Sequence, residues 1–253
     1  EILPSDWSSD VCSSDLSTPA LIFIHGFRGS HLGLTPIMRF LQDYQIYAPD
    51  LPPFGNAGTL EEYTSDTYAD YIIHFIRQQK LIQPILIGHS MGSIISAAIA
   101  EKYPDEINHR LILTSPIPEK TSRFFASLQP FVTIFPNNIL SFISTRFFFI
   151  PKNRQLYKKA LQMTRLSGAN FANRQDIKKV AHFSATTAIS DFTFQKDVLL
   201  ISGDHDRLVP QNSTKALAKK LHAQLAFVKN SGHLLNYESP EIVANLIRSF
   251  ISS

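Results

Sequence analysis

The chain has 253 residues, of which 44% are hydrophobic and 18% charged; this suits one large globular domain and excludes a disordered or collagen-like protein. The formal net charge of +3 gives no reason to expect nucleic-acid binding. The single cysteine excludes an internal disulfide and a cysteine-rich zinc module.

The first sixteen residues do not look like part of a folded core. They contain a Ser-Ser-Asp triplet twice, follow neither helical nor strand periodicity, and lack the pattern of a signal peptide. Residues 5–16 resemble the translation of a sequencing-library adapter. We therefore expect residues 1–16 to be a non-native segment or a disordered tail, with native sequence beginning near Ser17 and no function for Cys12. Because no signal peptide and no membrane-spanning apolar run is found, we expect a cytoplasmic protein.

Strands and helices alternate along the rest of the chain. Short apolar runs predict strands at residues 20–24, 44–49, 84–88, 110–114, 198–201 and 224–228. Helices are predicted at residues 35–43, 60–80, 91–103 and 212–221, and after residue 239. Parallel strands need crossover connections of this kind, so the alternation indicates an α/β fold: a mostly parallel sheet of about six strands with helices on both faces.

Three helix starts have local signals. Thr35 followed by Pro36 predicts an N-cap and a proline at the first helical position. Thr59 with Glu62 three residues later predicts a capping box. Pro240 predicts the start of the last helix.

Residues 116–195 interrupt the alternation and differ in composition. They hold 12 of the 19 phenylalanines and 11 Lys+Arg against 3 Asp+Glu, so their formal charge is +8 and that of the remaining chain is −5. Prolines and an Asn-Asn pair divide the segment into short helices. We interpret residues 116–195 as a helical insertion after the fourth strand, in a body made of residues 17–115 and 196–253.

Residues 88–92, Gly-His-Ser-Met-Gly, directly follow a predicted strand and precede a predicted helix. A tight turn in this context raises the Ser90 hydroxyl above the sheet, and the two glycines relieve crowding around it. A serine hydroxyl is a weak nucleophile at neutral pH, so it requires a histidine base and an acid that orients that base.

Nine histidines compete for the role of base. His233 stands apart, because Ser-Gly-His follows the last predicted strand and precedes the last predicted helix. We expect His25 and His89 to pack or hydrogen-bond at strand ends, whereas His205 lies in the turn that supplies the acid. The others have no acidic or glycine context and are expected to be surface or core residues: His31, His74, His109, His182 and His222.

The order of Ser90, an aspartate and His233, with this spacing, resembles that of the α/β-hydrolase superfamily. In that family the acid commonly lies in a G-x-x-D-x-x-V-P stretch, which corresponds to Asp206, with Asp204 as the alternative. The resemblance implies that Ser90 is the catalytic nucleophile, that His233 is the general base, and that Asp206 holds the base in the required tautomer.

The turn at residues 25–27, His-Gly-Phe, is similar to the oxyanion segment of the family. This implies that the backbone N–H groups of Phe27 and Met91 form the oxyanion hole. The loop at residues 50–55 is similar to the one after the family's fourth strand, and we interpret Asp50 as a turn residue there.

The chain departs from the family pattern in two ways. The family usually begins with two further strands, and no strand-like sequence precedes residue 20, so we expect these N-terminal strands to be missing. Ser93 stands where many relatives have glycine, which we expect to change packing rather than chemistry.

A serine at position 90 argues against the epoxide-hydrolase and haloalkane-dehalogenase branches, whose nucleophile is a carboxylate. The resemblance therefore implies a serine hydrolase that cleaves small-molecule carboxylic esters, of esterase or monoacylglycerol-lipase type, with no cofactor and no metal. A thioesterase or carbon–carbon bond hydrolase would use the same triad. A ligand receptor on the same fold is the alternative outside enzymes.

The position of residues 116–195 in the family pattern implies a cap that roofs the pocket. Its phenylalanines, including those at 124, 125, 131, 135 and 147–149, favour an apolar acyl or aromatic substrate, unless they pack cap helices onto the body. The charge of +8 favours either a solvated face, which we prefer, or weak peripheral contact with an anionic membrane surface or acidic substrates.

Overall fold

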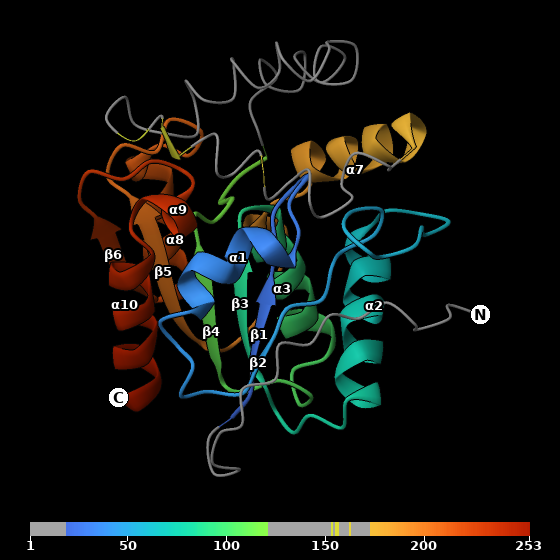
Figure 1. Cartoon of the computed structure of the whole chain (residues 1–253), viewed down its shortest axis with the longest axis horizontal. Coiled ribbons are helices and arrows are strands. Elements are labelled where there is room, and N and C mark those ends of the chain that lie inside the picture. Colours follow the sequence, from blue (N-terminus) through green and yellow to red (C-terminus); the bar gives the residue numbers. More distant parts are fainter. Residues whose placement is uncertain (1–18, 121–152, 154, 157–161, 163–172) are drawn as a thin grey trace.

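The computed structural model describes residues 19–120, 153, 155–156, 162 and 173–253 (Figure 1). The expectations for residues 1–16, and those for the phenylalanines between residues 124 and 149, lie outside the described residues. Within the described ranges, no helix is long and apolar enough to cross a membrane.

Six parallel strands form one sheet, as the sequence predicted, in the order β2-β1-β3-β4-β5-β6. The strands are β1 (Leu21–Ile24), β2 (Ile46–Tyr47), β3 (Ile85–His89), β4 (Arg110–Thr114), β5 (Asp197–Gly203) and β6 (Gln224–Val228). In the pairing of β1 with β3, Ile24 lies opposite Gly88, and in the pairing of β3 with β4, His89 lies opposite Thr114. Because all strands are parallel, the loops that follow them meet at one edge of the sheet.

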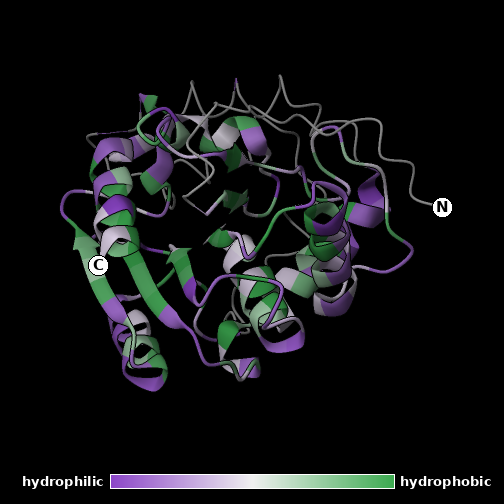
Figure 2. Cartoon of the chain, turned by 90° about the horizontal axis from the view of Figure 1, so that it is seen from below, coloured by the Kyte–Doolittle hydropathy of each residue, from purple (hydrophilic) through white to green (hydrophobic). Residues whose placement is uncertain are grey.

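Helices cover both faces of this sheet (Figure 1), which confirms the predicted α/β class. They are α1 (His31–Met38), α2 (Ser65–Gln78), α3 (Met91–Lys102), α7 (Arg174–Thr186), α8 (Gln211–Leu221), α9 (Leu235–Glu238) and α10 (Pro240–Ser252), with a 3-10 turn at Ile189–Asp191. Successive strand residues face opposite sides: Ile22 and Ile24 pack with α2 and α3, whereas Leu21 and Phe23 pack with α1 and α10. Figure 2 shows the hydrophobic residues concentrated on the strands.

Two predicted helix starts were wrong. The first helix begins at His31 rather than after Thr35, and Pro36 lies inside it. The Ser30 side chain does not cap α1; the N–H of His31 donates instead to the carboxylate of Asp50, which lies 2.7 Å away and 19 residues further along the chain. A rule based on neighbouring residues cannot find such a cap.

The helix predicted to start after Thr59 begins five residues later. Thr64 is its N-cap, and Thr67 takes the place of the expected Glu62. The Thr64 N–H donates to the Thr67 hydroxyl over 2.9 Å, and the Thr67 N–H donates to the Thr64 hydroxyl over 3.2 Å. A threonine at the third helical position therefore performs the reciprocal hydrogen bonding of a capping box. Pro240 begins α10, as predicted.

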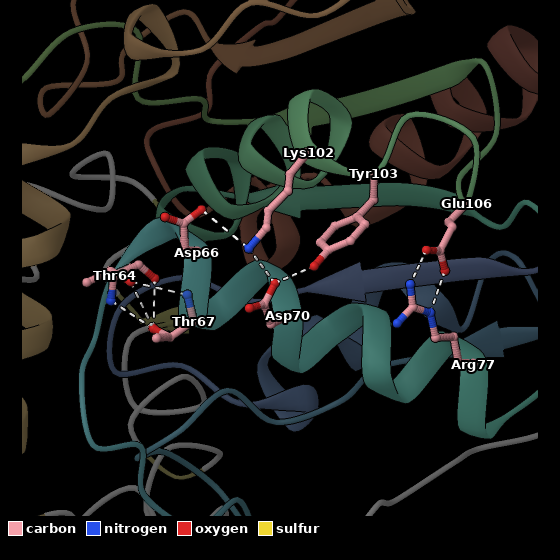
Figure 3. A network of polar contacts seen from close by, with 8 residues as sticks. All are labelled: Thr64, Asp66, Thr67, Asp70, Arg77, Lys102, Tyr103 and Glu106. Carbon is pink, nitrogen blue, oxygen red and sulfur yellow. Dashed lines mark hydrogen bonds and ion pairs between the residues drawn. The ribbon is translucent and has the colours of Figure 1, made fainter.

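Exposed polar side chains join α2 to the end of α3 (Figure 3). Asp70 accepts from Lys102 Nζ over 2.7 Å and from the Tyr103 hydroxyl over 2.6 Å, and Arg77 pairs with Glu106. Such solvent-exposed pairs are screened by water and salt, so the buried face of α2 accounts for most of its stability.

The described parts of residues 116–195 pack onto the body of the protein. Val180 and Phe183 of α7 and Ile189 belong to the same hydrophobic cluster as α2 and α3. The Ile189 N–H donates to the Ile117 carbonyl over 3.0 Å, which brings the two ends of the segment together.

Candidate active site

Ser90 occupies the tight turn between β3 and α3. Its φ of +53° lies in the left-handed region, which costs free energy for any residue with a side chain. The Ser90 N–H donates to the Thr114 carbonyl of β4 over 3.0 Å, and this bond fixes the turn above the sheet. A Cβ on Gly92 would lie 2.1 Å from the Ile24 carbonyl oxygen, so only glycine lets α3 begin this close to β1.

The structure brings Ser90 together with His233 and Asp206. The Ser90 hydroxyl lies 2.9 Å from His233 Nε2, and His233 Nδ1 lies 2.8 Å from Asp206 Oδ2. His233 is 2% exposed and Asp206 is also buried, so both interactions are shielded from water. The chain of hydrogen bonds matches the order nucleophile, base and orienting acid.

The carboxylate of Asp206 is stabilised in its charged form. Its Oδ1 accepts from the N–H groups of Leu208 and Val209 over 2.8 and 3.0 Å. Burial by itself would raise the pKa of Asp206. The charge and hydrogen bond of His233, with the two backbone N–H groups, outweigh burial and hold that pKa below its usual range.

The alternative acid, Asp204, does not reach His233. Its Oδ1 accepts from His205 Nδ1 over 2.6 Å and from the Ser231 N–H over 3.2 Å. Asp204 therefore fastens its own turn to the loop that carries His233.

Two further side chains fix the loop that carries His233, and no sequence pattern predicted either of them. The Ser115 hydroxyl donates to the His233 carbonyl over 2.7 Å. The Gly232 N–H donates to the Glu238 carboxylate over 2.6 Å. Both bonds hold the backbone next to the imidazole, so they restrict where its ring can lie.

His25 and His89 hydrogen-bond at strand ends, as the sequence predicted. His25 Nε2 accepts from the Leu51 N–H over 2.8 Å, so its Nδ1 carries the proton that is donated to the Gly26 carbonyl. Burial and the nearby His233 lower the pKa of His89 to about 3, so its ring is neutral. Its Nδ1 lies 3.1 Å from the Thr114 hydroxyl.

The residues expected to form the oxyanion hole lie beside Ser90. Met91 is the first residue of α3, so its N–H has no carbonyl one turn earlier to bind. The turn that carries Phe27 passes close to Ser90, because a Cβ added to Gly26 would lie 3.0 Å from the Ser90 Cβ. No group of three or more metal-ligating side chains occurs among the residues described.

Comparison with known proteins agrees with this architecture. The family described as alpha/beta hydrolase fold matches residues 19–240. The chain is 29% identical over 253 residues to an uncharacterized hydrolase, YugF, of Bacillus subtilis, covering 91% of this chain and 89% of that protein. It is 24% identical over 255 residues to Lipase 3 of a Moraxella species, covering 91% of this chain and 76% of Lipase 3. The structure of a thermophilic esterase from Thermogutta terrifontis superposes with a TM-score of 0.79 at 20% identity, covering 92% of this chain and 89% of that one. At this identity the similarity bears on the fold alone. The match over 222 of 253 residues is decisive: the chain belongs to the α/β-hydrolase family.

Proposed function

We propose that this protein is a serine hydrolase that cleaves carboxylic esters. The observation that carries the proposal is the continuous hydrogen-bond chain from Asp206 through His233 to Ser90, at the edge of the sheet where the strands end. Relatives named lipase, 76% of whose length is matched, support an ester as the substrate.

In the proposed reaction, Ser90 Oγ attacks the carbonyl carbon of the ester while His233 Nε2 accepts the hydroxyl proton. The carbonyl oxygen becomes an oxyanion, to which the N–H groups of Phe27 and Met91 donate. The intermediate collapses to an acyl-serine, and the departing alcohol takes the proton from His233. Water then attacks the acyl-serine as His233 accepts its proton; the second tetrahedral intermediate collapses, His233 returns that proton to Ser90 Oγ, and the carboxylic acid is released. Asp206 keeps the Nδ1 proton of His233 in place throughout.

We further propose that residues 116–195 form a cap over this site and contribute an apolar acyl pocket. The described start of the segment supports this placement: the Ile117 N–H donates to the Ser93 hydroxyl over 3.2 Å, and Ser93 donates in turn to the Ser90 carbonyl. The segment therefore leaves the body directly beside the nucleophile. An apolar lining there would favour esters with hydrocarbon acyl groups.

A fluorophosphonate probe tests the assignment, because it phosphonylates only an activated serine. We expect the wild type to be labelled, Ser90→Ala to lose labelling, and Ser213→Ala, which removes a half-buried serine of α8, to retain it. Esters of graded acyl length would then define the substrate. Labelling that persists in Ser90→Ala would overturn the site, and a wild type that neither reacts nor cleaves esters would overturn the function.

A further inference from the structure

The turn at residues 25–31, which carries Phe27, is tied to the rest of the protein at both of its ends. At the first end, the Leu51 N–H donates to His25 Nε2 over 2.8 Å. At the other end, the His31 N–H and His31 Nδ1 contact the Asp50 carboxylate at 2.7 and 2.9 Å. Two adjacent residues of one loop therefore hold both ends of the turn.

Asp50 is more than the turn residue that the sequence indicated. It is 5% exposed, and its Oδ2 accepts from the Asn56 N–H over 2.9 Å while Oδ1 accepts from His31. His31 Nδ1 lies 2.9 Å from both carboxylate oxygens. His31 has no acidic neighbour in the sequence, and its acidic partner comes from 19 residues further along the chain. This pair repeats the arrangement of His233 Nδ1 against Asp206 at a second place.

The same loop also supports the middle of the turn. The ring of Phe27 packs edge-on against that of Phe54, with centroids 5.7 Å apart, and Phe54 is fully buried. On its other side the turn passes close to Ser90, as the position of Gly26 shows. An oxyanion donor must lie about 2.7–3.1 Å from the developing charge, so a shift of a few tenths of an ångström at Phe27 weakens its bond.

We propose that Asp50 and His31 are positioning residues that hold the Phe27 N–H at the oxyanion. This inference rests on the proposed function, since it concerns how the transition state of ester cleavage is stabilised. Asp50 and His31 do not touch the reacting atoms in this proposal; they act through the backbone between His25 and His31. Their loss should therefore weaken binding of the transition state more than binding of the substrate.

The test compares Asp50→Asn, His31→Ala and His31→Asn on an ester that the wild type cleaves. It also measures inhibition by a trifluoromethyl ketone with the same acyl group, which Ser90 converts to a tetrahedral oxyanion. For Asp50→Asn and His31→Ala we expect kcat to fall at least about tenfold, short of the roughly 10²–10³-fold loss of a whole oxyanion donor, with KM nearly unchanged. Inhibition should weaken by the same factor as kcat/KM. His31→Asn should restore most of the activity, because its amide N–H replaces Nδ1 as a donor to Asp50.

Tyr68→Phe is the matched control, because the Tyr68 hydroxyl donates to the Pro52 carbonyl in the same loop over 2.6 Å. It should lower the melting temperature and leave kcat and inhibition near wild type. The positioning role is overturned if a folded Asp50→Asn keeps wild-type kcat and inhibition, or if His31→Asn is as impaired as His31→Ala. Should Asp50→Asn fail to fold, the two His31 variants decide the question. If the wild type is active and the variants keep its kcat, the positioning role fails and the proposed function stands. If the wild type cleaves no ester, the positioning role and the proposed function both fail.

Discussion

Replacing Asp206 by asparagine should invert the tautomer of His233. Asp206 Oδ1 accepts from two backbone N–H groups, those of Leu208 and Val209, and Oδ2 faces His233 Nδ1. An asparagine satisfies the two N–H groups only with its oxygen on that side, which turns its NH₂ group towards His233. His233 must then accept at Nδ1 and carry its proton on Nε2, where it cannot take the proton of Ser90.

The expected loss in kcat follows from the position of the single proton on the His233 ring. A triad whose histidine is held in the wrong tautomer loses about 10⁴-fold in kcat, which corresponds to ~5.4 kcal/mol of transition-state stabilisation. The assay is the steady-state rate of ester cleavage at pH 7 to 8, with unfolding by urea measured on the same sample to show that the fold is intact.

Asp204→Asn is the control for that experiment, because Asp204 carries the same charge in the same turn and contacts His205 and Ser231 instead of His233. Its kcat should stay close to that of the wild type. A folded Asp206→Asn variant that keeps kcat within about tenfold of the wild type would refute the reasoning, and equal losses in both variants would show that turn charge matters rather than the tautomer.

Two further predictions concern stability. Gly92→Ala should destabilise the fold by about 3 kcal/mol or more, because its Cβ would overlap the Ile24 carbonyl; Gly58→Ala meets no atom within 4 Å and should change the urea midpoint little. The pKa values of Asp206 and Asp50 are lower in the folded protein than in the unfolded chain. The unfolded chain therefore binds more protons in acid, so the free energy of unfolding should be steady above about pH 5 and fall as the pH drops below about 4. Urea titrations at several pH values check this. The free energy of unfolding of the Asp50→Asn variant should fall less steeply with decreasing pH than that of the wild type.

The sequence was sufficient where a feature depends on neighbouring residues. The apolar runs around Leu86 and Leu111 predicted strands buried on both faces, and both residues are fully buried in the sheet. Glycines at positions 88 and 92 placed Ser90 in a strand–turn–helix setting, because steric crowding at such a turn is local. The parallel topology then follows from the crossover helices.

The sequence was insufficient where hydrogen-bond partners lie far apart. Asp50 satisfies the first N–H of α1 and thereby moved the helix start away from Thr35. Ser115 holds the carbonyl of His233 from 118 residues away. Any serine or aspartate in a loop could make such a bond, and only the folded sheet decides which one does. The family resemblance favoured Asp206 over Asp204 as the acid, and the structure adds that Asp206 contacts His233 Nδ1 at 2.8 Å.

The hydrogen bond between His233 and Ser90 joins residues 143 positions apart. We expect a contact of such separation to form late in folding, since the entropy of closing a long loop is lost before the contact can stabilise the chain. The turn that carries Ser90 lies against β1, β3 and β4, whereas His233 follows β6, the last strand in the sequence. A folding intermediate that holds only the β1–β4 part of the sheet would therefore still lack the hydrogen bond between Ser90 and His233. Recovery of activity during refolding consequently reports the final docking of the carboxyl-terminal segment, which is a more stringent criterion than recovery of secondary structure.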